Sequence, residues 1–228
     1  MKVVIVSLRD VALIRNALTR LGFDVVHKDP DLVIVSGGDG SILYSERLFP
    51  SIPKLAFKRT RVCRRCEYPI NNLNESLLKL RDGLYEVKEE MKLRAIFKNQ
   101  VFVALNEIQV RNKLPTRALR FSLAVNDKIY PYLIGDGVIV STPFGSSGYY
   151  HAAGGEPFDQ GIGVCLNNPF STCERSFVVS EDSKVRVKVL RETAFLAADN
   201  EDERITEMRE GEEVYIEKNE KARLINLL

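Results

Sequence analysis

The sequence predicts an α/β domain followed by an all-β, sandwich-like domain. In the first part of the chain, short apolar runs typical of buried strands alternate with segments of helical periodicity, which is typical of a parallel sheet with helices on its faces. After about residue 88, strand-like runs follow one another and helical periodicity nearly disappears. A chain of 228 residues has room for two small domains. We therefore expect domains at 1–87 and 88–217.

The first domain is expected to combine four strands with three helices. Helix 10–22 has an apolar stripe at helical spacing, Asp10 is placed to cap its first turn, and Gly22 suits the position after its last residue. Helix 71–83 likewise ends at a glycine. The other expected elements are the strands 2–7, 23–26, 31–36 and 53–57 and the helix 41–49.

The second domain is expected to be all-β and antiparallel, with strands separated by turns such as Asn126-Asp127. The apolar runs that predict them are 92–97, 101–110, 119–125, 128–134, 136–141, 163–167, 184–190, 193–198 and 213–217.

Composition and charge exclude several classes of protein. The 33 basic and 31 acidic residues give a net charge of +2, which does not suggest a nucleic-acid binder. No apolar run approaches the roughly 18 residues that span a bilayer, so we expect no membrane association, a cytoplasmic location and four reduced cysteines. Cys63 and Cys66 have the spacing of half a zinc site, but Cys165 and Cys173 form no second pair. A zinc-dependent interaction module is therefore an alternative, and the leading expectation includes no metal ligands.

The segment Gly37–Ser41, with the sequence GGDGS, joins an expected strand to an expected helix. This position lies at the carboxyl edge of the sheet, where α/β folds bind ligands. Glycines permit unusual dihedral angles and let peptide N–H groups approach an anion, and the start of a helix adds a favourable dipole. The alternative is a plain strand-to-helix turn.

The segment 136–155, with the sequence DGVIVSTPFGSSGYYHAAGG, is a second candidate site. Gly145 and Gly148 would let the backbone approach a ligand, Ser147 offers a hydroxyl, and Tyr149 offers an aromatic face. A flexible linker would not contain so many aromatic residues. A structural loop folded under the sheet is the alternative.

Asn106 and Glu107 form a third candidate, because they are adjacent polar residues inside an apolar strand and would face opposite sides of it. Buried polar groups need partners, and a ligand is one such partner. A strand edge in solvent is the alternative. The sequence lacks a P-loop and a Gly-x-Gly-x2-Gly motif after the first strand, and its two histidines do not support a histidine-based metal site or triad.

Taken together, the three stretches resemble the NAD kinase family, and in particular its short, archaeal-like members. The motifs occur in the family's order and at similar separations, and the resemblance covers most of the chain. It implies a Rossmann-like first domain, a β-rich second domain and a last segment, 218–228, that packs back on the first. It also implies transfer of the γ-phosphoryl of ATP, or a phosphoryl of polyphosphate, to the 2′-hydroxyl of the adenosine ribose of NAD. Mg²⁺ would bridge the ATP phosphates, and the protein would be a homo-oligomer, a dimer or a tetramer.

The resemblance assigns roles to individual residues. Asp39 would be the catalytic residue and would accept the proton of the ribose hydroxyl, for which it needs only hydrogen-bond reach. Asp136 would approach the nicotinamide end. The other residues expected at NAD are Gly40, Asn106, Glu107, Ser147, Gly148, Tyr149, Ala152 and Asp199. The residues expected at the donor phosphates are Gly37, Gly38, Gly40, Ser41, Arg59 and Arg61.

The chain departs from the family pattern after strand 53–57, where the basic segment 58–66 replaces a glycine-rich loop. Its arginines would grip phosphates, but a solvated loop paired with the acidic segment 199–213 is the simpler interpretation. The missing glycines make a non-catalytic dinucleotide-binding homologue one alternative function, and a lipid kinase of the same superfamily is another. The presence of Asp39 and the hydroxyl-rich segment 136–155 favour the NAD kinase.

Overall fold

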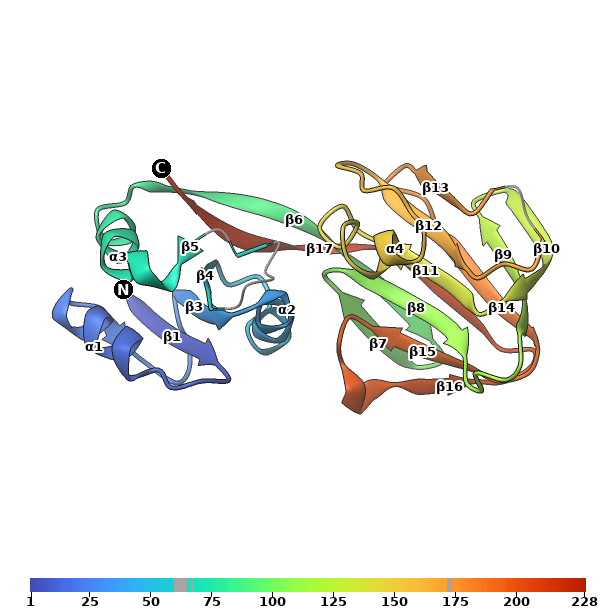
Figure 1. Cartoon of the computed structure of the whole chain (residues 1–228), viewed down its shortest axis with the longest axis horizontal. Helices are drawn as coiled ribbons and strands as arrows, with labels where there is room; N and C mark the ends of the chain where they lie inside the picture. The colour runs from blue at the N-terminus through green and yellow to red at the C-terminus, as the bar shows by residue number, and fades with distance from the viewer. Residues whose placement is uncertain (60–64, 67, 172–173) are drawn as a thin grey trace. The chain divides into compact units, whose positions relative to one another are not determined.

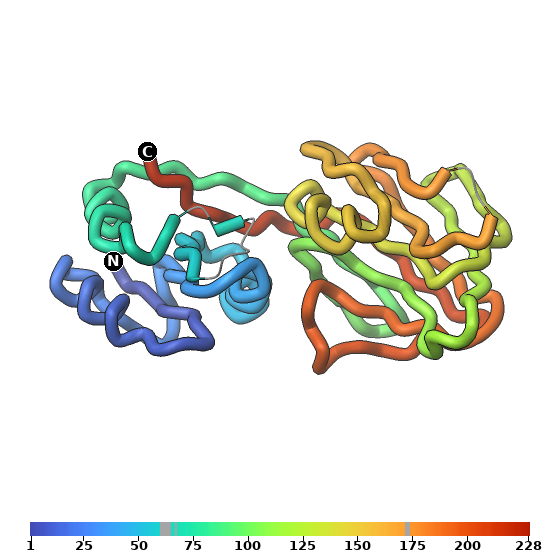
Figure 2. Tube along the Cα trace, in the orientation of Figure 1, coloured from blue at the N-terminus to red at the C-terminus, as the bar shows by residue number. Residues whose placement is uncertain are grey.

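The computed structural model describes residues 1–59, 65–66, 68–171 and 174–228, which form two compact units (Figure 1). Unit 1 comprises Met1–Glu90 and Lys221–Leu228, and unit 2 comprises Met91–Glu220. Both chain termini belong to unit 1 (Figure 2). Unit 1 is α/β and unit 2 is β-rich, so the predicted fold class is confirmed.

Unit 1 is built on a parallel sheet in the order β2-β1-β3-β4. Strand β5 also pairs with β4, and the end of β17 reaches it through Leu224 and Lys54. The strands are β1 (Lys2–Ser7), β2 (Asp24–Val25), β3 (Leu32–Gly37), β4 (Lys54–Lys58) and β5 (Tyr68–Pro69). The helices are α1 (Ala12–Arg20), α2 (Asp39–Leu48), the 3-10 turn η1 (Ile70–Asn72) and α3 (Leu73–Arg81).

The two faces of this sheet carry different helices. Helices α1 and α3 pack on one face, where Ile34 of β3 and Phe57 of β4 join their buried side chains in one apolar cluster. Helix α2 packs on the other face. Lys54 reaches it from β4, and its ammonium lies 2.5 Å from Glu46 Oε2 and also donates to the carbonyls of Phe49 and Ile52. Because side chains alternate along a strand, each strand position can be assigned to one of these faces.

Unit 2 is a sandwich of two sheets around one apolar core. One sheet has the order β10-β9-β14-β17, with β6 and β7 attached through β17, and the other has the order β13-β12-β11-β8-β15-β16. The first sheet contains β6 (Tyr85–Phe97), β7 (Gln100–Ala104), β9 (Leu119–Val125), β10 (Lys128–Gly135), β14 (Val185–Arg191) and β17 (Glu213–Leu227). The second contains β8 (Glu107–Asn112), β11 (Gly137–Ser141), β12 (Ile162–Asn167), β13 (Ser176–Val179), β15 (Ala194–Ala198) and β16 (Thr206–Met208). Two short helical turns, α4 (Tyr149–Ala152) and η2 (Asp202–Arg204), complete the unit.

Two expectations about local structure are wrong. Helix α2 begins at Asp39 instead of residue 41, so Asp39 and Gly40 lie in its first turn. The expected strand 101–110 is interrupted at Leu105 and Asn106, between β7 and β8. In the parts of the chain that the structure describes, no helix is both long enough and apolar enough to cross a membrane.

Candidate functional site

The Gly37–Ser41 segment lies at the carboxyl end of β3, where the chain turns directly into α2. Gly38 is extended, with φ −125° and ψ −168°, so it does not adopt the glycine-specific conformation that we expected. The requirement at Gly37 is space, because a Cβ there would lie 2.1 Å from Ser41 Oγ and 2.9 Å from Ser41 Cβ. The glycine therefore lets the first turn of α2 approach the strand end.

Asp39 is the acidic residue of the first turn of α2, where the helix dipole stabilises a negative charge. Its Oδ1 accepts a hydrogen bond of 2.9 Å from the backbone N–H of Arg65. The residue is half-buried, whereas the neighbouring Gly40 is exposed. A carboxylate held in this way has a fixed direction, which is what a group that must reach one hydroxyl needs.

The basic segment that follows β4 is only partly described. Arg59 continues the pairing of β4, since its N–H donates to Gly37 O at 3.0 Å. Arg61 and Cys63 lie outside the described residues, and so does most of the basic segment 58–66. Cys66 is disulfide-bonded, so the expectation of four reduced thiols is wrong for this residue, whereas Cys165 is a free, buried thiol.

Asp199 organises the polar cluster of unit 2. Its carboxylate accepts backbone N–H groups from three successive residues, Leu105 at 2.8 Å, Asn106 at 2.7 Å and Glu107 at 3.2 Å. In return, Asp199 N donates to Glu107 O at 2.9 Å. These bonds explain why the strand is interrupted at Asn106, because the carboxylate takes N–H groups that a sheet partner would otherwise bind.

Glu107 is 5% exposed at the start of β8. Its Oε1 accepts a hydrogen bond from Gln109 at 3.3 Å, and its Oε2 is buried without a partner among the described residues. Burial, and to a lesser extent the negative charge of Asp199, raise the pKa of Glu107 to about 7, against a smaller lowering by Gln109. A carboxyl group with an unused buried oxygen is suited to hydrogen bonding with ligand hydroxyls.

The loop after β11 folds against Asn106. Thr142 N donates to Asn106 O at 2.9 Å, and Thr142 Oγ1 donates to Leu105 O at 2.6 Å. A Cβ on Gly145 would lie 2.3 Å from Asn106 O, and one on Gly148 would lie 3.9 Å from Asn106 Nδ2. The structure thus brings Asn106 beside the glycines that precede α4.

Around the start of α4, the predicted ligand-binding residues are accessible. Gly148 and Ala152 are exposed, and Ser147 and Tyr149 are half-buried. The Tyr149 hydroxyl accepts a hydrogen bond from Asn167 Nδ2 at 3.3 Å, which orients the ring. The buried Tyr150 anchors the helix, packing on Ile139 and Cys165.

Asp136 lies away from this cluster. Its Oδ2 accepts a hydrogen bond from Asn168 Nδ2 at 2.8 Å, and Asp136 precedes the end of β11 at which Gly137 pairs with Arg111. Glu107 pairs with Ser141 at the other end of the same strand. The four residue steps between these pairs amount to about 13 Å at the rise of a β-strand.

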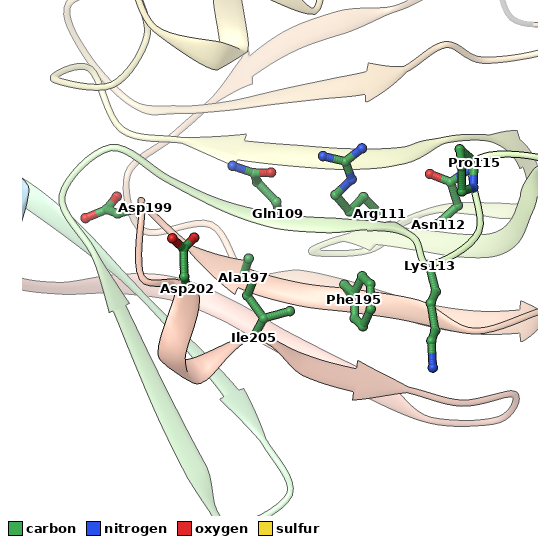
Figure 3. Close-up of a pocket in the computed structure, with 10 residues that line it drawn as sticks. All are labelled: Gln109, Arg111, Asn112, Lys113, Pro115, Phe195, Ala197, Asp199, Asp202 and Ile205. Carbon is green, nitrogen blue, oxygen red and sulfur yellow. The ribbon is translucent and has the colours of Figure 1, made fainter. Parts of the chain in front are cut away.

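A pocket of about 460 Å³ opens beside Asp199, over β8 and β15 (Figure 3). Gln109 and Arg111 project from β8, Phe195 lies on β15, and Asp202 lies near Asp199 at one end of the pocket. The remaining lining residues are Asn112, Lys113, Pro115, Ala197 and Ile205. Asp199 is the one predicted site residue that lines this pocket, so the pocket adjoins the Asn106 cluster without containing it.

Apart from Asp136, the predicted site residues that the structure describes form two groups within the units. Unit 1 holds Gly37, Gly38, Asp39, Gly40, Ser41 and Arg59 at the edge of its parallel sheet. Unit 2 holds Asn106, Glu107 and Asp199, with the residues around α4 next to Asn106. Among the described residues, no group of three or more His, Cys, Asp or Glu side chains is placed to hold a metal ion.

Comparison with known proteins identifies the family. The profile of the ATP-NAD kinase C-terminal domain matches residues 105–227, which is more than half of the chain. An NAD kinase of Methanothermobacter thermautotrophicus is 31% identical over 216 residues, covering 92% of this chain and 76% of the relative. The chain belongs to the NAD kinase family.

Two solved structures resemble the whole chain. A crystal structure of an NAD kinase from Archaeoglobus fulgidus in complex with ATP aligns with a TM-score of 0.86 and 27% identity, covering 100% of this chain and 94% of that one. Yeast NADH kinase complexed with NADH aligns with a TM-score of 0.89, covering 100% of this chain and 84% of that one. At 16% identity, the yeast structure shows the fold alone.

Proposed function

We propose that this protein is an NAD kinase that transfers the γ-phosphoryl group of ATP, or a phosphoryl group of polyphosphate, to the 2′-hydroxyl of the adenosine ribose of NAD, giving NADP. Family membership and the Asn106–Glu107–Asp199 cluster support this proposal most strongly. The NAD kinase relatives favour it over a lipid kinase of the same superfamily, and Asp39 at the start of α2 favours it over a non-catalytic dinucleotide-binding homologue.

In this proposal the residues of unit 2 bind the dinucleotide. Asn106 and Glu107 would bind the ribose and diphosphate. The buried Oε2 of Glu107 would accept a hydrogen bond from a ribose hydroxyl. Asp199 would act mainly by holding the backbone of these two residues, which differs from the direct contact suggested by the family resemblance. The residues that would line the NAD pocket around α4 are Ser147, Gly148, Tyr149 and Ala152. Asp136, about 13 Å along the sheet by the strand rise, would contact a different part of the dinucleotide.

Asp39 would be the catalytic residue. Phosphoryl transfer has a loose transition state, so positioning and charge neutralisation dominate the catalysis. A carboxylate fixed by Arg65 N and by the start of α2 would orient the ribose hydroxyl and accept its proton. The ribose oxygen forms a bond to the phosphorus of the transferred group, while the bond between that phosphorus and the donor's leaving phosphate breaks.

Mg²⁺ would enter this reaction with the donor. Because the described residues offer no cluster of carboxylates for the ion, phosphate oxygens and water would supply most of its ligands. The ion would offset the charge of the donor phosphates when it is bound. Gly38, Gly40 and Ser41, at the start of α2, would contact phosphates of the donor, and so would Arg59. In the same proposal, the protein is cytoplasmic and forms a homo-oligomer, either a dimer or a tetramer.

The direct test is to incubate the purified chain with NAD and Mg²⁺, adding ATP in one reaction and polyphosphate in another, and to measure NADP. We expect NADP with at least one donor, and the comparison names that donor. NAD binding without NADP formation under either condition would favour the non-catalytic homologue.

A further inference from the structure

Two buried hydrogen-bond donors lack acceptors at the carboxyl edge of the sheet in unit 1. Ser36, the penultimate residue of β3, is 1% exposed, and its Oγ has no hydrogen-bond partner within the described part of the chain. Arg59 follows β4, and its Nε is likewise buried without a partner there. Buried polar groups are nearly always hydrogen-bonded in native proteins, so two unpaired buried donors on neighbouring strands require an explanation.

Strand alternation places both side chains on the same face of the sheet. Ile34 points into the apolar cluster with α1 and α3, so Ser36, two residues later, faces the same side. Phe57 belongs to that cluster too, and Arg59 is two residues beyond it. Ser36 pairs with Phe57, and Arg59 N bonds to Gly37 O, so the ladder continues to Arg59. This is the face opposite to α2, so the side chains of Ser36 and Arg59 are separate from the first turn of α2.

A third polar side chain lies next to them. Ser7 ends β1 and pairs with Ser36, and it shares the face of Val3, which belongs to the same apolar cluster. Ser7 Oγ accepts the backbone N–H of Arg9 at 3.2 Å, so its own O–H remains available as a donor. Ser7, Ser36 and Arg59 thus place donors at or next to the ends of three adjacent strands.

The chemistry of this edge indicates an anion. The guanidinium only donates, and the two hydroxyls can donate, so the missing group is an acceptor with several oxygens. Asp10, the carboxylate that follows β1, accepts the N–H of Ala12 through Oδ1 at 2.9 Å, and within the described part of the chain no ion pair joins it to Arg59. A phosphate matches the planar fork of arginine and has oxygens left for hydroxyls. Arg59 is only half-buried, so its side chain can turn towards a ligand at the edge.

We propose that Ser36, Arg59 and Ser7 form a phosphate subsite that holds a non-transferred phosphate of the phosphoryl donor, on the face of the sheet opposite to α2. This inference rests on the proposed kinase function and deepens it, since it assigns the donor's phosphate chain a second anchor besides the start of α2. The shared chemistry is a phosphoanhydride chain, from a nucleoside triphosphate or from inorganic polyphosphate.

The test uses the full chain and measures binding of inorganic tripolyphosphate, without NAD, by calorimetry. The variants are Ser36→Ala, Arg59→Ala and Arg59→Lys, and Arg15→Ala is the control because it removes an exposed arginine from α1 in the same unit. We expect about tenfold weaker binding for Arg59→Ala and a smaller loss for Arg59→Lys and Ser36→Ala, in line with the loss of one or two charge-assisted hydrogen bonds. Arg15→Ala should bind within about twofold of the unchanged protein. Unchanged binding in both Ser36→Ala and Arg59→Ala would overturn the subsite.

A thermal unfolding measurement guards against a purely structural effect. If the Ser36 hydroxyl has no partner until an anion binds, Ser36→Ala should unfold at the same or a higher temperature without ligand, and should gain less from added tripolyphosphate. A lower unfolding temperature without ligand would mean that the hydroxyl is already satisfied, and would contradict the proposal.

Steady-state kinetics separate this inference from the kinase assignment. With ATP and with tripolyphosphate as donors, we expect the donor KM to rise about tenfold in Arg59→Ala while the KM for NAD stays unchanged. NADP formation with an unchanged donor KM would refute the subsite and leave the kinase intact. Tripolyphosphate binding that depends on Ser36 and Arg59 in a chain that forms no NADP would support the subsite and refute the kinase. An effect seen with ATP but not with tripolyphosphate would assign these residues to the nucleoside and overturn the phosphate assignment.

Discussion

Glu107 should make the folded protein less stable as the pH rises from about 4.5 to about 7. The pKa of its buried carboxyl group is raised to about 7, from 4.5 for the ordinary group. Below pH 4.5 the group is protonated in both the folded and the unfolded chain. Between the two values the unfolded chain ionises while the folded chain keeps its proton, so stability falls as the pH rises through this window and levels off above it.

The size of the effect follows from the two pKa values. A separation of about 2.5 units corresponds to roughly 3 kcal/mol of unfolding free energy at 1.36 kcal/mol per unit. Glu107→Gln has nearly the same shape and cannot ionise, so it should lack this slope. Relative to the unchanged protein, the variant should gain about 3 kcal/mol between pH 4.5 and pH 7.5.

Urea unfolding at a series of pH values measures this difference. Glu210→Gln is the matched control, because Glu210 is exposed and its replacement should leave the pH dependence unchanged. If the unfolding free energies of Glu107→Gln and the unchanged protein ran parallel from pH 4.5 to 7.5, the reasoning about the buried carboxyl group would be refuted.

Two further predictions concern the polar cluster of unit 2. Asp199→Ala removes the acceptor of three backbone N–H groups and puts alanine at a φ of 49°, so we expect a loss of about 3–5 kcal/mol in urea unfolding. Asparagine tolerates that φ and keeps one acceptor oxygen, so Asp199→Asn should lose about half as much unfolding free energy. Equal losses in the two variants would contradict the role of the Asp199 carboxylate as the acceptor of these N–H groups. Gly145→Ala should cost about 1–3 kcal/mol and weaken NAD binding in calorimetry, because its Cβ would lie 2.3 Å from Asn106 O. Gly148→Ala is the milder comparison, with its Cβ 3.1 Å from Gly145 O, and a larger effect there would show that the contact with Asn106 is unimportant.

Much of unit 1 could be predicted because its signals are local. The apolar stripe of α1, the Asp10 carboxylate that accepts Ala12 N, and Gly22 at φ 81° lie within one short stretch of chain. Gly83 ends the third helix region in the same way, with φ 75°. Periodicity and end signals of this kind are visible without tertiary structure.

The features that sequence analysis missed depend on residues far apart in the chain. Asp199 interrupts the strand at Asn106 through hydrogen bonds between segments more than ninety positions apart. The bond from Arg65 N to Asp39 likewise joins residues 26 positions apart. The Gly-Gly-Asp-Gly motif marked the right strand end, but Gly38 is extended and does not use the unusual dihedral angles that a glycine permits. Close packing of Gly37 against Ser41 explains one of these glycines.

The sequence allowed two interpretations of the basic segment 58–66. Its arginines could bind phosphates, or it could be a solvated loop paired with the acidic segment 199–213. In unit 2, Glu207 pairs with Lys113, and Glu212 pairs with Lys98 at 2.7 Å, so these two carboxylates have local partners. The Nε of Arg59 is buried without a hydrogen-bond partner among the described residues, which favours a phosphate-binding role for this arginine over the solvated loop.

The central claim is that Asp39 carries the chemistry of an NAD kinase, and Asp39→Asn tests it most directly. Asparagine keeps the shape and an acceptor oxygen for Arg65 N, but it cannot accept the proton of the ribose hydroxyl. We predict that the variant loses NADP formation while calorimetry shows NAD affinity within about tenfold of the unchanged protein, or about 1.4 kcal/mol. Sustained NADP formation by Asp39→Asn, or a loss of NAD binding as large as the loss of turnover, would contradict the catalytic role.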